Sequence, residues 1–141
     1  MGYLPLESPK MSRLLAWIQE NIPGQHRVLD AWGAGEMERV TVNVGWPDFA
    51  HWEAHTLLRG IPHSELIKRR DLIREFYVTP DPNRAFSILK ENGIEYFMVT
   101  AIERRIYANE NPNLDKFSMN SDYFRLVHQE EGEAIYAPAV R

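Results

Sequence analysis

Three residues that could do chemistry follow residues 94–100 (IEYFMVT), the segment most clearly typical of a strand. They are Glu103, Arg104 and Tyr107, and the first and last are four apart, so both lie on one face if the segment is helical. In open α/β sheets, ligands bind beyond the carboxyl ends of parallel strands. The pattern therefore allows two interpretations, which are a ligand site and a structural Glu–Arg pair beside a packed tyrosine.

Two histidines, His51 and His55, have the spacing of a zinc-binding pair on a helix. The metalloprotease pattern needs glutamate directly after the first histidine, but Trp52 stands there, and no third ligand is evident. The alternative is a pair of partly exposed polar residues. The chain also contains no cysteine, which excludes disulfides, thiolate nucleophiles and cysteine-ligated metals. We therefore predict no metal site.

A loop with two glycines, Gly33-Ala34-Gly35, follows an apolar segment and is similar to part of a phosphate-binding loop. A dinucleotide-binding loop needs a third glycine or alanine where Glu38 stands, and then a helix, but segment 39–44 is rich in β-branched residues. The P-loop motif and the Gly-x-Ser-x-Gly nucleophile elbow are both absent. We therefore predict a plain loop, no cofactor and no catalytic residue.

A basic cluster, Lys68-Arg69-Arg70 with Arg74, could bind phosphate groups or anionic lipid heads. The same segment also contains three acidic residues, Glu65, Asp71 and Glu75. A solvated helix face with balanced charge is therefore the competing interpretation.

The elements that would position these residues follow from periodicity, capping residues and glycine or proline stops. We expect helices at 8–21, 49–58, 64–77, 82–92 and 102–107, and strands at 26–32, 39–44, 94–100, 124–129 and 133–137. A helix that leads through Gly93 into a strand is half of a βαβ unit, and the last two strands form a hairpin. The chain is thus expected to be a single α/β domain over residues 1–141, a three-layer-like sandwich with a mixed β-sheet and a C-terminal hairpin.

Composition sets the remaining limits. The 141 residues are 44% hydrophobic and 26% charged, which is typical of a globular domain, and the net charge of −4 gives no reason to expect nucleic-acid binding. No apolar run approaches the roughly 18–20 residues that span a bilayer. As an isolated chain, the protein is expected to be soluble.

Several short motifs resemble, in order and spacing, the C-terminal soluble part of a membrane-protein family. That family is the YYY group of multi-spanning proteins from Chloroflexi and archaea (Chlor_Arch_YYY). The likeness covers about residues 12 to 137. The motifs are Arg27–Gly33, Gly45-Trp46-Pro47, Arg59-Gly60, Arg69–Tyr77, Asp81-Pro82, Asn92–Val99, Ile102-Glu103-Arg104, Tyr107, Lys116-Phe117 and Ala134-Ile135-Tyr136.

The resemblance implies a fragment of a glycosyltransferase-like polytopic membrane protein that uses lipid-linked sugars. In such enzymes the catalytic carboxylate usually lies in the membrane part, so this chain would be a non-catalytic accessory domain. It would lie on the extracytoplasmic face, with the transmembrane part of its parent protein and a sugar-phosphate lipid as partners. The candidate ligand contacts are Arg59, Arg70, Glu103, Arg104 and Tyr107.

The sequence departs from the family pattern at two places. Thr100-Ala101 replaces the family's Val-Gly, and the segment around His55 lacks its His-Glu pair. Two other hypotheses therefore stay open. One is a free-standing cytosolic nucleotide-binding or enzymatic domain that uses the glycines at 33–35, and the other is an interaction module anchored by Trp46 and Trp52.

Overall fold

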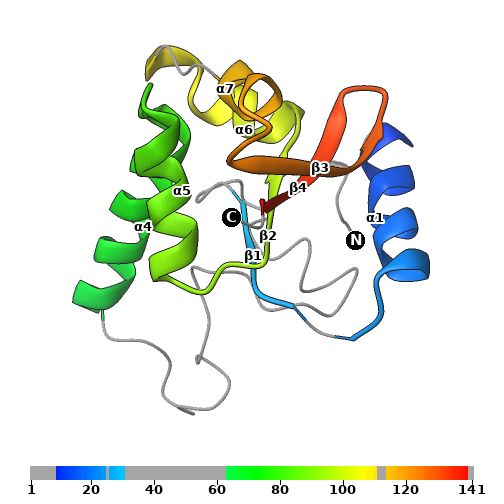
Figure 1. The fold of residues 1–141 in the computed structure, drawn as a ribbon, viewed down its shortest axis with the longest axis horizontal. Coiled ribbons are helices and arrows are strands. Elements are labelled where there is room, and N and C mark those ends of the chain that lie inside the picture. The colour runs from blue at the N-terminus through cyan, green and yellow to red at the C-terminus, as the bar shows by residue number, and fades with distance from the viewer. Residues whose placement is uncertain (1–8, 25, 31–62, 111–113, 140–141) are drawn as a thin grey trace.

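The computed structural model describes residues 9–24, 26–30, 63–110 and 114–139. These ranges form a four-stranded sheet with helices on both faces (Figure 1). The elements are α1 (Pro9–Asn21), β1 (Val28–Leu29), α4 (His63–Val78), α5 (Pro82–Glu91), β2 (Tyr96–Val99), α6 (Ala101–Ile106), the 3₁₀ turn η2 (Ala108–Glu110), α7 (Asp115–Met119), β3 (Phe124–Glu130) and β4 (Glu133–Pro138).

The sheet is mixed, and its strand order is β1-β2-β4-β3. β2 pairs in parallel with β1 and antiparallel with β4, which also pairs antiparallel with β3. The chain between β1 and β2 includes α4 and α5, as a parallel pair requires a long crossover. The predicted α/β class, mixed sheet and C-terminal hairpin are confirmed.

One face of the sheet packs against α1. Leu14, Leu15 and Ile18 recur at helical spacing on α1, and all are buried. They join inward-facing strand residues such as Met98 and Ile135 in one apolar cluster. Pro23 and Gly24, which has a φ of +83°, follow this helix, as expected from the sequence.

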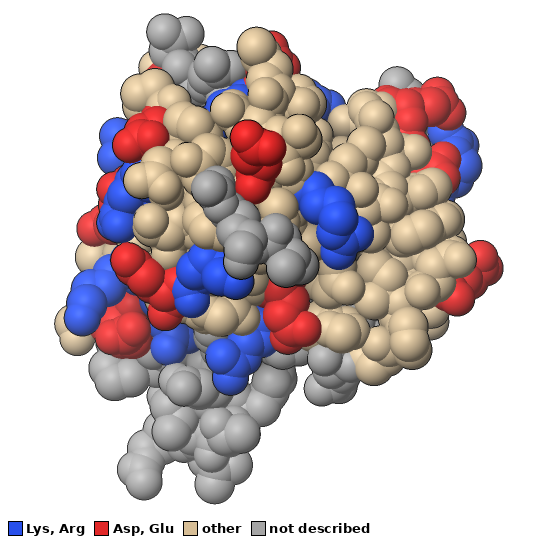
Figure 2. All heavy atoms as spheres, in the orientation of Figure 1, with Lys and Arg blue, Asp and Glu red and all other residues tan. Residues whose placement is uncertain are grey.

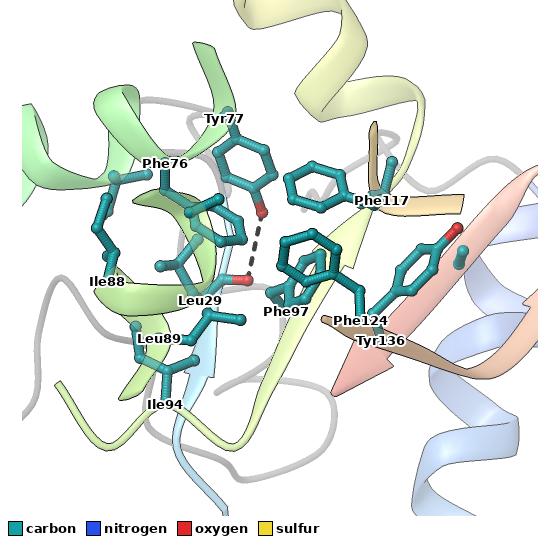
Figure 3. Packing of buried hydrophobic residues seen from close by; sticks show 14 of the residues in the cluster. Leu29, Phe76, Tyr77, Ile88, Leu89, Ile94, Phe97, Phe117, Phe124 and Tyr136 are labelled. Atoms are coloured by element: carbon teal, nitrogen blue, oxygen red, sulfur yellow. Dashed lines mark hydrogen bonds between the residues drawn. The ribbon is translucent and has the colours of Figure 1, made fainter. Parts of the chain in front are cut away.

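The other face packs against α4, α5 and α7 in a cluster rich in aromatic rings (Figure 3). Phe97 lies at its centre, stacked on Tyr136 with the ring centroids 5.3 Å apart and edge-on to Phe76 at 4.9 Å. The ring centroid of Phe117 of α7 lies 4.7 Å from that of Phe97. Such ring pairs add roughly 0.5–1.5 kcal/mol each beyond their buried area. Phe97 and Met98 face opposite layers because strand side chains alternate.

Helix α5 begins and ends as its sequence predicts. The Asp81 carboxylate accepts a hydrogen bond from the Asn83 backbone N–H at 3.0 Å, and Pro82 occupies the first helical position. Gly93 follows the helix with a φ of +63°, the left-handed conformation that favours glycine. The chain then enters β2, so the predicted helix–glycine–strand unit is confirmed.

The hairpin of β3 and β4 turns through Glu131 and Gly132, since Glu130 pairs with Glu133. Both turn residues have positive φ, 50° and 96°, as a two-residue type I′ turn requires. This geometry matches the right-handed twist of the strands. The register shifts between Leu126 and His128, so β3 carries a bulge along the edge of the sheet.

The helices expected at 8–21, 64–77, 82–92 and 102–107 are present, and none of their ends differs by more than one residue. The strand expected at 26–32 is shorter in the structure: among the described residues, β1 includes only Val28 and Leu29. The strand at 39–44, the helix at 49–58, Gly33-Ala34-Gly35 and the histidines at 51 and 55 lie outside the described residues.

Candidate functional site

The carboxyl end of β2 leads directly into α6, and this junction is where the sequence predicts a site of Glu103, Arg104 and Tyr107. Thr100 has an extended backbone and caps α6, and its hydroxyl accepts a hydrogen bond from the Ile102 N–H at 3.2 Å. Glu103 completes this capping box, because its Oε1 accepts a bond from the Thr100 N–H at 2.8 Å. The Glu103 side chain is fully buried, so its carboxylate serves the local fold.

A second carboxylate, that of Glu133 at the start of β4, also lies at this helix end. Its two oxygens accept from the Ala101 N–H at 3.2 and 3.1 Å, and Arg104 Nη2 lies 3.3 Å from Oε2. Glu133 is only 3% exposed. Carboxylates of the chain itself therefore occupy the first N–H groups of α6, where an anionic ligand would otherwise be attracted.

Arg104 is the accessible member of the predicted trio. Half of its side chain is exposed, and besides the ion pair with Glu133 it donates to the Gly132 carbonyl at 3.3 Å. The guanidinium thus ties α6 to the hairpin while part of it faces solvent. This arrangement contains the Glu–Arg pairing that the sequence allowed, but the glutamate is Glu133 and not Glu103.

Tyr107 lies in the core, where its ring stacks on Tyr77 with centroids 5.4 Å apart. The Tyr77 hydroxyl donates to the carbonyl of Met98 at 2.6 Å. It also lies 3.4 Å from the carbonyl of Leu29 (Figure 3). Tyr77 thereby joins α4 to both parallel strands. Tyr107 is only 4% exposed, so its ring packs against the protein interior.

Arg70 lies elsewhere on α4, seven residues before Tyr77 and therefore about 10 Å away along the helix axis. Its side chain is half exposed and 3.7 Å from Asp71 Oδ1. The structure does not place Arg70 at the β2–α6 junction beside Arg104. Arg59 lies outside the described residues, so its role stays a prediction.

The basic cluster on α4 is matched by acidic groups. Lys68 and Arg69 both lie within 4 Å of the Glu65 carboxylate, at 3.9 and 3.2 Å, and Arg74 pairs with Glu110 at 2.5 Å. Glu75, expected to balance this cluster, instead binds Arg84 of α5. Basic and acidic side chains alternate over the side formed by α4 and α5 (Figure 2).

Lys116 of α7 is a buried lysine, a feature common at functional sites, and the residue patterns in the sequence do not predict its burial. Its ammonium group is buried and donates to the carbonyls of Tyr77 at 2.8 Å and Thr79 at 2.6 Å. Burial lowers the pKa of Lys116 to about 8. These contacts satisfy carbonyls at the end of α4, so the lysine acts as a C-terminal cap supplied from another element. No local sequence signal could reveal a cap from 37 and 39 residues away.

The described residues contain no group of three or more His, Asp or Glu side chains that could hold a metal ion. In the same ranges, none of the helices has the length and hydropathy of a bilayer span.

Comparison with solved structures shows where this arrangement of elements occurs. The crystal structure of the C-terminal globular domain of an oligosaccharyltransferase from Archaeoglobus fulgidus matches it with a TM-score of 0.63. The match covers 94% of this chain and 99% of that domain at 15% sequence identity. The two proteins share a fold.

No protein-family model and no curated protein matches the sequence. The resemblance to the YYY family therefore stays a prediction. The structural match is nonetheless to a domain of a glycosyltransferase, the class of protein that the resemblance implied.

Proposed function

We propose that this chain is a non-catalytic accessory domain of a glycosyltransferase-like membrane protein. The supporting observation is the fold shared with the oligosaccharyltransferase C-terminal domain over nearly the full length of both chains. The capping roles of Glu103 and Glu133 agree with a domain without its own catalytic carboxylate at the β2–α6 junction. Its partner is the transmembrane part of the parent protein, and it lies on the extracytoplasmic face.

We further propose that the domain contacts a lipid-linked sugar phosphate or the acceptor through its accessible arginines. Arg70 and Arg104 keep about half of each side chain exposed, and the planar guanidinium suits a phosphate group. Glu103 and Tyr107 are both buried, and they support the surface at Arg104 from within. Arg59 completes the proposed set.

The reading frame in the source genome tests the first proposal. We expect the sequence encoding this chain to be preceded, in frame, by a series of transmembrane segments. A stop codon directly upstream would contradict the proposal and would favour a free-standing protein.

Titration with a short-chain prenyl-phosphate glucose tests the second. We expect weak binding that falls as salt rises, with amide shifts in residues 101–104, and about tenfold weaker binding for Arg104→Gln. Arg84→Gln is the matched control, since Arg84 is also a half-exposed, ion-paired arginine. Equal effects of the two substitutions, or no shifts at millimolar ligand, would overturn the proposed contact.

A further inference from the structure

A separate hollow lies at the opposite end of β2 from the α6 junction. Its volume is about 380 Å³, which is within the range of small-molecule sites. It is lined from three parts of the fold, by the end of α5, the turn into β2 and the paired strands β3 and β4. The described lining residues are Leu89, Lys90, Gly93, Ile94, Glu95, Tyr96, Arg125, Ala137 and Pro138.

The hollow contains two cationic side chains, Lys90 from α5 and Arg125 from β3. Within the described part of the chain, neither forms an ion pair with a carboxylate, although Lys90 lies 5.9 Å from the centre of the Phe86 ring. Most other described cations have a carboxylate partner. These are Arg13, Lys68, Arg69, Arg70, Arg74, Arg84 and Arg104. Lys90 and Arg125 thus come from distant parts of the sequence and line the same hollow.

Among the described lining residues, the acidic one, Glu95, is already engaged. Glu95 Oε1 lies 2.7 Å from Nδ1 of His26, and its Oε2 accepts from the Arg27 N–H at 3.3 Å. Glu95 therefore does not neutralise Lys90 or Arg125 through a direct ion pair. The local balance favours an anionic ligand.

The remaining lining residues indicate the body of that ligand. Leu89, Ile94 and Ala137 are buried and form the floor of the hollow, and the partly exposed Pro138 of β4 gives its wall an apolar surface. Tyr96 also lines the hollow and is partly buried, with its ring edge-on to that of His26 at 5.3 Å between centroids. A free phosphate ion would leave most of this volume and all of its apolar wall without a contact.

We propose that this hollow binds an organic phosphate ester with a body of about one sugar ring, held by Lys90 and Arg125. The arginine fork and the lysine ammonium group both donate to phosphate oxygens, and the apolar wall contacts the organic body. This proposal stands on the hollow itself and does not depend on a membrane parent. Its residues are distinct from Arg59, Arg70 and Arg104.

Titration of the ¹⁵N-labelled full chain with glucose 6-phosphate, inorganic phosphate and glucose tests it. We expect saturable shifts at the amides of Gly93 and Arg125, tighter binding of the ester than of either fragment, and weaker binding at higher salt. Lys90→Gln and Arg125→Gln should each weaken binding about tenfold. Lys68→Gln, which removes an exposed lysine outside the hollow, should leave it unchanged.

Absence of saturable shifts at these amides, or equal weakening by Lys90→Gln and Lys68→Gln, would count against binding of the soluble ester. A second arm therefore measures cosedimentation with phosphatidylcholine vesicles with and without phosphatidylinositol 4-phosphate, whose headgroup is a phosphorylated ring. Binding that requires this lipid and is lost in Lys90→Gln would identify the ester as a lipid headgroup, whereas binding of glucose 6-phosphate alone would identify a soluble source. Failure in both arms overturns the proposal. The amide spectrum of each variant serves as the folding control, so that a loss of binding is not mistaken for unfolding. Failure of this proposal would leave the reading-frame test of the membrane parent unaffected.

Discussion

At the scale of single residues, polar side chains near the β2–α6 junction mostly complete the local fold. The type and spacing of Glu103 suit a ligand contact, yet the same spacing after Thr100 is also that of a capping box. Sequence alone does not distinguish a ligand contact from a capping residue, because the burial of the Glu103 side chain decides between these roles. Glu133 and Lys116 could not be found from local patterns, since each acts on an element remote in the chain.

Replacing Glu103 with alanine tests its structural role. The change leaves the buried Thr100 N–H without its acceptor, so we expect the free energy of unfolding to fall by roughly 1–3 kcal/mol. Urea denaturation measures this loss. Glu91→Ala, at an exposed site on α5, is the control and should change stability by less than about 0.5 kcal/mol. Equal small effects would mean that the Glu103 carboxylate is free to serve a ligand.

His26 makes the stability of the fold depend on pH. Its Nδ1 faces the Glu95 carboxylate at 2.7 Å and its Nε2 faces the Pro23 carbonyl at 2.8 Å, so both nitrogens can donate only when the ring is protonated. Burial alone would lower the pKa of His26, but the hydrogen bonds to Glu95 and Pro23 and the Glu95 charge outweigh it, and the pKa is raised above 6.5.

Because the folded-state pKa is the higher one, this contribution to stability is complete below the unfolded pKa of 6.5 and is lost as pH rises through the folded pKa. We expect the stability difference between the wild-type protein and His26→Gln to shrink from about pH 5 to about pH 8. Urea denaturation at several pH values measures it, and NMR titration of the ring gives the pKa directly. A difference that does not vary with pH would contradict the proposed double donation.

At the scale of elements, helix ends and turns were the most predictable features. Asp81, Pro82 and Gly93 define α5 by local chemistry, and the hairpin follows from two alternating segments around a glycine. Strand lengths were less predictable. The apolar residues of segment 26–32 do not show where pairing stops, because that depends on the length of the neighbouring strand.

The hairpin turn offers a test at this scale. Gly132 has a φ of +96°, which an alanine adopts only with strain, although the space around its Cα is not crowded. We expect Gly132→Ala to lower the free energy of unfolding by about 1–2 kcal/mol. Glu131→Asn, with a residue better suited to positive φ, should cost less even though it removes the contact with Arg13. If alanine at 132 is tolerated better than asparagine at 131, the assigned turn is incorrect.

Lys116 joins α7 to the end of α4, and its buried charge gives this joint a distinct pH profile. Its pKa is about 8 in the folded state and 10.5 as a free side chain. Between these values the unfolded chain binds more protons, so this residue makes stability rise with pH. We expect the wild-type protein to gain stability relative to Lys116→Met as pH increases from 8 to 10.5, measured by urea denaturation. A constant difference would show that the ammonium group is solvated.

At the scale of the whole molecule, the sheet makes one cooperative unit of two apolar layers. Adjacent residues of β2 face opposite layers, with Phe97 in the aromatic cluster and Met98 against α1. The α/β class could be predicted because both layers leave periodic patterns in the sequence. The strand order could not, since pairing partners depend on contacts between distant segments.

Cooperativity between the layers predicts similar unfolding behaviour for damage on either side. Leu14→Ala opens a cavity under α1 and Ile88→Ala one under α5, and we expect each to cost about 2–5 kcal/mol. Both variants should show a lower urea midpoint with an unchanged slope, and tryptophan fluorescence and circular dichroism should report one transition. Two separate transitions in the Leu14 variant would instead mean that α1 unfolds alone.

The packing of α1 against the hairpin also has a consequence for biosynthesis. Arg13 contacts Glu131 across 118 positions of sequence, and Leu14 and Ile18 share a cluster with Ile135. During translation, α1 leaves the ribosome before the hairpin, and the 118 positions from Arg13 to Glu131 must be made before the two can meet. At about 5–20 residues per second, this delay is on the order of ten seconds. Throughout that interval the apolar face of α1 is exposed and available to chaperones. Its exposure ends when the hairpin forms and covers it.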